Sequence, residues 1–366
     1  MKLFRHLHPG ENPDVEIGRF LTESAHFDHI PPFFGEISVT HPGEEKTTIA
    51  FMQGLIANQG DGWSWFLGQF TALFRETALP PAPAEPPSAS FLRDELPSVD
   101  IPAGAQAMVR AAALLGQRTA EMHLALSSSN DAPAFAPEPM TPEDLAQDAR
   151  RIETQIASAL EALKAKLVTL DDATADSAAV LLSRRLELYG RARAIQNSHA
   201  GGQRIRIHGD YHLGQTLRTA APAGAQQRED GDFVLIDFEG EPARPLEERR
   251  RKQSPLKDVA GMLRSFSYVV QAARHPLEVT DHEQSQLLAS ANIANWSRVL
   301  EVQLGSAFLG AYRAAMAGNS ALLPAPQDAQ PLLEAYLLEK VLYELLYELN
   351  NRPTWLPIPI AGVLSL

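Results

Sequence analysis

The chain has 366 residues, of which 45% are hydrophobic and 21% charged, and its formal net charge is −13. This length and composition predict a globular protein with one large domain or two ordinary ones. The acidic balance argues against nucleic acid or an anionic membrane as a partner, because both bind cationic surfaces. Cysteine is absent, which excludes disulfides and thiolate metal sites.

The ends of the chain and its apolar runs bear on location. No apolar run is long enough to span a bilayer, and the start MKLFRHLHPGE lacks the apolar core of a signal peptide. A chain without cysteine also suits a reducing compartment. These features together predict a cytoplasmic protein.

The N-terminal stretch predicts a small β-rich unit. Residues 2–7 read as the end of a strand rather than as a mobile tail. Asn12 and Pro13 then have the cap and first-turn positions of a helix that continues to about Ala25. Residues 33–40 and 47–57 are β-branched and apolar runs joined by HPGEE, which predicts a hairpin.

The remainder reads as mostly helical. Asp61 is a plausible cap for a helix to Phe74, and Trp63 and Trp65 at its start are interpreted as packing residues rather than ligand contacts. Residues 79–102 are rich in Pro, Ala and Ser and predict a surface loop. The further predicted helices span residues 106–126, 141–167 with Thr141 as cap, 176–199, 256–273 and 329–349, and one or two helices fill residues 282–317.

Two apolar runs that end in acidic residues carry the chemistry. Residues 205–207 lead into HGDYHLGQ, and residues 233–236 lead into DFEG. We expect two strands that deliver Asp210, Gln215 and Asp237 to one edge. A carboxylate that can accept a hydroxyl proton, an amide oxygen and a second carboxylate form a set of hard oxygen ligands suited to magnesium and phosphate chemistry.

Other polar residues near these motifs have plainer interpretations. His208 is interpreted as a packed loop residue, because a lone histidine in a loop is more often structural. His208 and His212 have a spacing that could suggest zinc on a helix, but the intervening Gly209 and Asp210 argue against a helix there. The basic run 249–252 could be a phosphate patch; a solvated loop that ties the structure together is the favoured interpretation.

The two motifs resemble the catalytic and metal loops of the kinase fold, in which an HxD loop precedes a D-x-G loop. The HGD start is similar to that of aminoglycoside phosphotransferase-like kinases. Gln215, together with DFEGEPARPLEERRRKQSPLKDVAGMLRS, resembles the maltokinase family over residues 208–264. The resemblance implies an α+β, protein-kinase-like fold with an incomplete β-rich N-lobe over residues 1–58 and a mostly helical C-lobe over residues 59–366.

The resemblance also implies ATP and Mg²⁺ as cofactors. Asp210 would orient and deprotonate the acceptor hydroxyl, while Gln215 and Asp237 would hold magnesium. Lys2 on the first strand would pair with Glu16 on the next helix and position the nucleotide phosphates. The hinge from about Gln53 to Ile56 would contact adenine, an assignment that follows from order along the chain.

The last long helix predicts a sugar surface. At about 100° per residue, one side carries a row of aromatic and polar residues that can stack on a sugar and bond its hydroxyls. These residues are Tyr336, Lys340, Tyr343, Glu344 and Tyr347. A tyrosine-rich helix packed under a loop is the alternative. The resemblance assigns Lys340, Tyr343, Tyr347 and Asp258 to substrate binding, although the helix dipole alone could explain Asp258.

The resemblance implies ATP-dependent phosphorylation of maltose to maltose 1-phosphate for α-glucan synthesis, and association or fusion with trehalose synthase. A kinase for another small alcohol or sugar is one alternative. An inactive or partner-dependent fragment is another, because the strands and phosphate-covering loop that precede the lysine in the family are not in this sequence. Unpaired apolar edges would then predict poor solubility or dependence on a partner.

Overall fold

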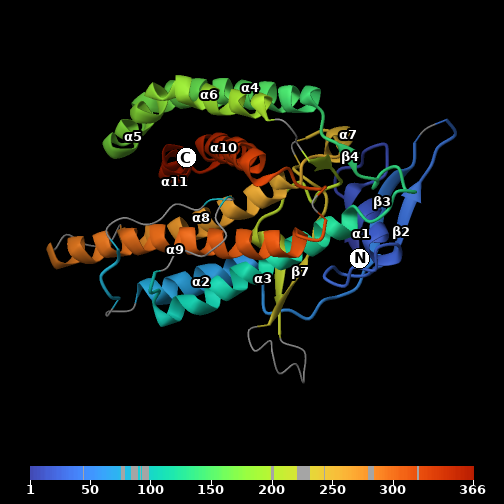
Figure 1. The fold of residues 1–366 in the computed structure, drawn as a ribbon, viewed down its shortest axis with the longest axis horizontal. Coiled ribbons are helices and arrows are strands. Elements are labelled where there is room, and N and C mark those ends of the chain that lie inside the picture. Colours follow the sequence, from blue (N-terminus) through green and yellow to red (C-terminus); the bar gives the residue numbers. More distant parts are fainter. Residues whose placement is uncertain are drawn as a thin grey trace.

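A computed structural model describes most of the chain (Figure 1). It covers residues 1–43, 45–75, 79–83, 90, 92, 99–198, 202–220, 231–242, 244–278, 284–319 and 321–366. For residues 275–278 and 284–290 it describes the backbone alone. Most of the Pro-rich segment 79–102 and the polar insert before Phe233 lie outside these ranges.

A three-stranded antiparallel sheet carries the N-terminal residues (Figure 1). In spatial order its strands are β1 (Lys2–Leu3), β3 (Thr47–Gln53) and β2 (Phe33–Val39). The predicted hairpin is confirmed, since β2 and β3 pair antiparallel, although the second strand ends earlier than expected. Helix α1 (Pro13–Glu23) packs beside β2.

Helix α1 ties this sheet to the rest of the molecule. Asn12 caps it as predicted, because its side-chain oxygen accepts the backbone N–H two residues later at 2.9 Å. Ile17 and Leu21 are buried in the main core. The ring of Phe20 stacks on that of Phe135, with centroids 3.7 Å apart. Because Phe135 belongs to a distant loop, this contact joins the sheet to the helical part.

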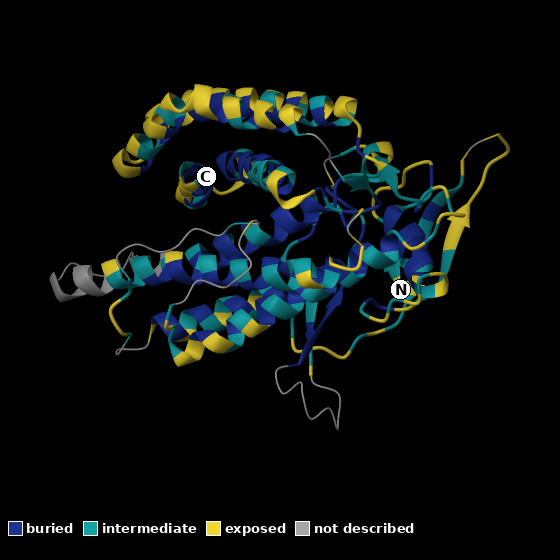
Figure 2. Cartoon of the chain, viewed as in Figure 1, coloured by how far each residue is buried: buried dark blue, intermediate teal, exposed yellow. Residues whose placement is uncertain are grey.

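The outer side of the sheet remains apolar and exposed. Leu3 and Phe34 are 64% and 63% exposed, and Ile37 and Met52 are 54% and 50% exposed. Figure 2 shows β2 as one of the most exposed strands. Contiguous exposed apolar side chains favour association with another surface.

The two acidic motifs follow short strands that have separate partners. Strand β5 (Gln203–Arg204) pairs with β4 (Glu138–Pro139), and β7 (Asp232–Leu235) pairs with β6 (Thr216–Thr219). The expected strand at 205–207 is therefore wrong: Ile205 makes only an isolated bridge to Gln253. The two motifs meet through their loops instead, because a Cβ on Gly209 would lie 3.3 Å from the Cα of Gly240.

Helices form the larger part of the molecule in approximate layers (Figure 1). The first layer holds α4 (Pro142–Lys166), α5 (Asp172–Ser183) and α6 (Arg185–Ala194), and the next holds α10 (Pro326–Asn351) and α11 (Pro357–Ser365). Below them lie α8 (Leu256–Glu278), α9 (Gln284–Met316), α2 (Gly62–Phe74) and α3 (Ala103–Leu126). Short elements are η1 (Leu167–Thr169), η2 (Ile195–Asn197), η3 (Leu213–Gln215), α7 (Leu246–Arg249) and η4 (Pro353–Trp355).

Most predicted helices and caps are confirmed. Asp61 and Thr141 accept backbone N–H groups at the starts of α2 and α4. The single helix expected over 176–199 is wrong, because the chain breaks at Arg184 into α5 and α6. Helix α5 packs on α11 while α6 packs on α4, and Arg184 donates to the carbonyl of Leu364 at 3.0 Å. Within the described ranges, no helix has the length and apolar character to cross a membrane.

The contact between α3 and α9 gives a stability prediction. A Cβ on Gly116 of α3 would lie 2.1 Å from the backbone oxygen of Phe308 in α9. Gly116→Ala should therefore lower the free energy of unfolding by about 1–3 kcal/mol, the usual cost of overpacking a core. Denaturant unfolding followed by circular dichroism measures this.

Gly310 of α9 provides the control, because a Cβ there would meet no atom within 4 Å. Gly310→Ala should leave stability unchanged or raise it by up to about 1 kcal/mol, since alanine favours helix more than glycine does. Equal stability of the Gly116→Ala variant and the parent chain would contradict the close helix contact.

Candidate active site

The loop after β5 holds its shape through His208. The ring Nε2 of His208 lies 2.9 Å from the backbone oxygen of Ile236, and the ring packs against Phe238 with centroids 4.7 Å apart. His208 is 1% exposed. Its predicted role as a packed loop residue is confirmed, and it links the Asp210 loop directly to the end of β7.

Asp258, in the first turn of α8, holds the same loop through hydrogen bonds. Its carboxylate accepts the backbone N–H groups of His208 at 2.8 Å and Gly209 at 3.0 Å, and it lies 3.1 Å from the ring Nε2 of His123. Burial alone would raise the pKa of Asp258, but His123 and the loop N–H groups lower it below its usual range. The predicted substrate contact is wrong, because both carboxylate oxygens are used within the protein and the residue is 2% exposed.

Gln215 and Asp237 come together as expected. The amide Nε2 of Gln215 donates to Oδ2 of Asp237 at 3.2 Å. Asp237 has a φ of 66°, a left-handed backbone conformation that is uncommon for residues other than glycine. Such strain tends to occur at functional sites. The side-chain oxygens of both residues remain of the type that binds magnesium.

Lys2 contacts this acidic end but not Glu16. Its Nζ lies 2.6 Å from Asp237, 2.9 Å from Asp14 and 2.5 Å from Glu239. The predicted pair of Lys2 with Glu16 is therefore wrong. Asp14 and Glu16 lie about 200° apart around α1, so only one of them can face Lys2. Glu16 turns the other way.

The three carboxylates around Lys2 form a candidate cation cluster. Oxygen atoms of Asp14, Asp237 and Glu239 lie within 4.8 Å of one another. The ammonium of Lys2 already supplies one positive charge to them, and its pKa is raised: burial opposes the charge, but Asp14 and the other carboxylates outweigh burial. Hard carboxylate oxygens gathered around a cation fit the chemistry that Mg²⁺ requires.

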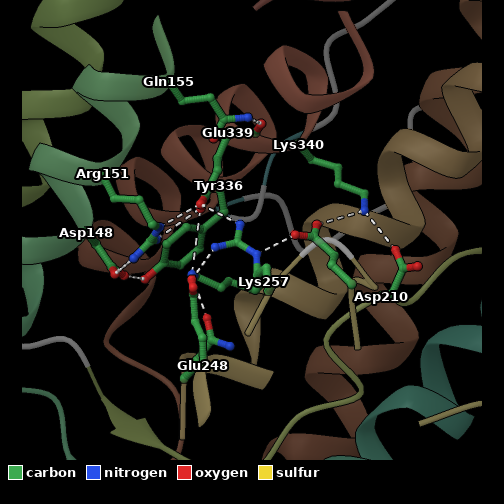
Figure 3. A network of polar contacts seen from close by, with 12 residues as sticks. Asp148, Arg151, Gln155, Asp210, Glu248, Lys257, Tyr336, Glu339 and Lys340 are labelled. Atoms are coloured by element: carbon green, nitrogen blue, oxygen red, sulfur yellow. Dashed lines mark hydrogen bonds and ion pairs between the residues drawn. The ribbon is translucent and has the colours of Figure 1, made fainter. Parts of the chain in front are cut away.

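Asp210 lies in a second charged cluster, which Figure 3 shows from close by. Nζ of Lys340 lies 3.0 Å from Oδ1 of Asp210 and 3.3 Å from Oε1 of Glu241. Arg244 holds the other oxygen of Glu241 at 2.5 Å and approaches Glu339 at 3.6 Å. Lys340 therefore bridges two carboxylates from different loops at the edge of a larger ionic network.

The charge state of Asp210 follows from this bridge. Burial would raise the pKa of Asp210, but Lys340 and the nearby His212 lower it below its usual value. Lys340 stays protonated, because Asp210 and Glu241 raise its pKa more than burial lowers it. Asp210 is therefore an anion at neutral pH and can accept a hydrogen bond from a hydroxyl group.

A cavity of about 580 Å³ opens beside Asp210. Lys340, Tyr343 and Tyr347 line it, so the helix surface expected for a sugar does face an open site. Its other aromatic walls come from Trp63, Tyr268 and Trp355. The rings of Tyr268 and Trp355 are stacked, with centroids 6.0 Å apart.

Gln53 and Ile56, predicted to contact adenine, lie away from the aromatic cavity. Gln53 lines a small cavity together with Asp14 and Asp237, which brings it near the acidic cluster. Ile56 is half-buried and is not part of that cavity lining. Adenine contact by Gln53 and Ile56 stays a prediction.

The sequence did not predict a site role for several residues that the structure places there. Trp63 lines the cavity, although its position at a helix start predicts a packing residue. Glu344, which the helix periodicity does place on the same face as Tyr343, lines the cavity as well. Glu239 and Glu241 stand within the motif DFEGE, so their acidity was the available signal. The sequence does not single out Asp14, because Asp14 and Glu16 are both acidic and differ only in the direction in which they point from α1.

Glucosamine kinases resemble this chain in sequence over most of its length. No family model matches the chain. A glucosamine kinase from Streptacidiphilus jiangxiensis is 25% identical over 345 residues, covering 93% of this chain but 62% of that protein. A glucosamine kinase from Mycolicibacterium smegmatis is 26% identical over 369 residues, covering all of this chain and 74% of that protein.

The fold is similar to that of solved glucosamine kinase structures. A glucosamine kinase in complex with glucosamine, ADP and inorganic phosphate matches with a TM-score of 0.68 and 22% identity, covering 100% of this chain and 71% of that one. Another crystal form of glucosamine kinase matches with a TM-score of 0.69 and 22% identity, covering 100% of this chain and 73% of that one. The expected kinase-like α+β fold agrees with these neighbours, and the narrower aminoglycoside phosphotransferase-like class stays a prediction.

The expected partners need correction. Maltose as substrate is wrong, because the relatives found are kinases named for glucosamine. Association with trehalose synthase is likewise unsupported by any of these matches. Motifs expected for phosphoryl transfer can be shared by kinases for different sugars, so they do not predict which sugar is bound.

Asp258 gives a prediction with a defined pH dependence. Asp258→Asn leaves the His208 and Gly209 N–H groups without a charged acceptor and should cost about 3–5 kcal/mol of unfolding free energy at pH 7. Because the folded-state pKa of Asp258 is lowered, its stabilisation is present above the ordinary value near 4 and is lost as pH falls through the folded pKa. The difference in unfolding free energy between Asp258→Asn and the parent chain should therefore become smaller at acidic pH.

Urea unfolding between pH 3 and pH 8 measures that difference. The exposed Asp176 of α5 offers a control, and Asp176→Asn should change stability by less than about 0.5 kcal/mol. A difference between Asp258→Asn and the parent chain that stays constant down to pH 3 would argue against the buried anion.

Proposed function

We propose that the chain transfers the γ-phosphoryl group of ATP to a hydroxyl group of a small amino sugar, with glucosamine as the first candidate. The observation that carries this proposal is the position of the anionic Asp210 at the wall of an aromatic cavity. The relatives named glucosamine kinase support the sugar. The Gln215 and Asp237 pair on the adjoining loop supports the nucleotide chemistry.

Asp210 would orient the acceptor hydroxyl and take its proton as the sugar oxygen attacks the γ-phosphorus. The bond from the γ-phosphorus to the bridging oxygen breaks, and ADP leaves. Such transfers depend mainly on positioning and charge stabilisation. A hydroxyl that approaches Oδ1 of Asp210 must share it with Lys340, and Glu241 can keep the ammonium in place meanwhile.

Gln215 and Asp237 would hold Mg²⁺, since their oxygens fit that ion. When bound, the ion neutralises negative charge on the phosphates. Lys2 lies next to Asp237 and is expected to contact the phosphates. Asp14 accepts the backbone N–H of Phe238 at 2.9 Å and so holds the Asp237 loop in place from α1.

The cavity lining suits a cationic sugar. It contains three acidic side chains, Asp210, Glu344 and Glu348, against the two basic side chains of Lys340 and Arg352. Oε2 of Glu344 accepts from the buried Arg264 at 2.7 Å, whereas Oε1 has no hydrogen bond to any described residue. That free oxygen can accept from an ammonium group, and aromatic rings attract both sugar C–H faces and cations.

A panel of acceptors with ATP tests the proposal. Glucosamine should be phosphorylated with a kcat/KM at least tenfold above that of glucose and of N-acetylglucosamine, because both lack the ammonium group. Glu344→Gln should reduce this preference by raising KM for glucosamine without a comparable effect on glucose. ADP release in a coupled assay and mass spectrometry of the product give the readout.

Equal turnover of all three sugars would favour a kinase for neutral sugars or other alcohols. Absence of turnover with every acceptor would require calorimetry with a non-hydrolysable ATP analogue. A folded chain that does not bind the analogue would support the inactive or partner-dependent alternative.

Asp210→Asn tests the base. It should lower kcat by about 10²–10⁴-fold, the usual contribution of a positioned general base, while the thermal unfolding midpoint and ATP affinity change little. Asp61→Asn is a matched control, because asparagine also caps helices and Asp61 lies at the start of α2. Activity retained in Asp210→Asn would exclude Asp210 as the base.

A further inference from the structure

A second cavity of about 400 Å³ lies apart from the sugar cavity, between the segment 133–144, the start of α4 and the segment 248–254. Six arginine or lysine side chains and five aspartate or glutamate side chains line it. It shares no lining residue with the sugar cavity. The basic run 249–252 supplies three of its cations, namely Arg250, Arg251 and Lys252.

Arg206 makes this cavity electrostatically unusual. It is 2% exposed and donates from Nη1 to Glu16 at 2.7 Å. Its Nε and Nη2 are buried and have no hydrogen-bond acceptor in the described part of the chain. The ring of Phe135 lies 5.6 Å from its guanidinium carbon, which offers a π face but no lone pair. Buried donors without an acceptor carry a desolvation cost of about 1–3 kcal/mol.

The carboxylate that contacts Arg206 is shared with a second arginine. Arg250 also binds Glu16, at 2.9 Å, so two guanidinium groups share one carboxylate. Arg204, next to them in the lining, pairs with Glu138 and Asp144, but its buried Nε lacks an acceptor among the described residues. Burial lowers the pKa of Arg206 despite Glu16, as expected for a charge with too little compensation.

We propose that this cavity binds the phosphate group of a small ligand, either inorganic phosphate or a small phosphate ester. A phosphate at the wall beside Arg206 and Arg250 supplies the missing negative charge, and guanidinium groups bind phosphate oxygens in bidentate geometry. Arg251 lines the same cavity and has no ion pair with another described residue, so it is available to the ligand. The residues proposed for phosphoryl transfer do not line this cavity.

Ligand binding in this cavity would also affect the candidate active site indirectly, through α1. Glu16, which holds both arginines, lies two residues after Asp14 in the first turn of this helix. Asp14 contacts Lys2 and the Asp237 loop. A phosphate that competes for Arg206 and Arg250 therefore acts on the same helix start that supports the acidic cluster.

Calorimetric titration of the full chain tests the site. The probes are inorganic phosphate and glycerol 3-phosphate, each in the presence of a saturating non-hydrolysable ATP analogue so that the nucleotide site is filled. Arg206→Lys keeps one positive charge but loses the planar fork, and it should weaken binding at least tenfold. Arg193→Lys, at a guanidinium that is 65% exposed on α6, should bind as the parent chain does.

Arg251→Gln gives a second variant at an exposed position that should fold normally and weaken binding about threefold or more. Crystals soaked with tungstate, a phosphate analogue, should show an anomalous peak within hydrogen-bond distance of Arg206 or Arg250. Tighter binding of glycerol 3-phosphate assigns an ester, and tighter binding of phosphate assigns the free ion. Tungstate absent from the cavity, or unchanged affinity in both Arg206→Lys and Arg251→Gln, would overturn the assignment.

Discussion

The buried carboxylate of Asp258 is the interaction on which the site depends. It receives two backbone N–H groups of the Asp210 loop, and its contact with His123 continues to the hydroxyl of Tyr312, 2.9 Å from the histidine ring. A single polar chain thus joins α9, α3, α8 and the loop. Because buried hydrogen bonds to a charged group are strong and directional, the loop inherits the rigidity of the helical core.

Two lysines organise the acidic residues that this scaffold presents. Lys2 gathers carboxylates from α1 and from the loop after β7, and Lys340 joins Asp210 to Glu241. Like charges so close together would otherwise repel one another, and each ammonium offsets that repulsion. Under the proposed function, a metal or a hydroxyl group would reach these carboxylates by replacing part of the contacts that a lysine makes with them.

Local features of the sequence predicted well, and features that depend on helix phase or tertiary contact did not. Asn12 and Thr141 could be recognised as caps because a cap bonds to residues two or three positions away. The partner of Lys2 could not, since Asp14 and Glu16 are equally acidic and only the rotation of α1 separates them. Asp258 was misassigned for a related reason: its position in the first turn of α8 predicts a favourable carboxylate but not the direction in which it points.

The choice of sugar is a further step away from the motifs. Asp210, Gln215 and Asp237 are proposed to serve phosphoryl transfer, a reaction whose demands are the same for many alcohols. The cavity proposed to bind the sugar is built instead by side chains from α2, α8, α10 and η4, which come from distant parts of the sequence. Trp63 faces Tyr268 at a centroid distance of 6.0 Å only because α2 packs against α8. A resemblance confined to these two loops therefore bears on the proposed reaction, whereas the proposed substrate depends on tertiary packing.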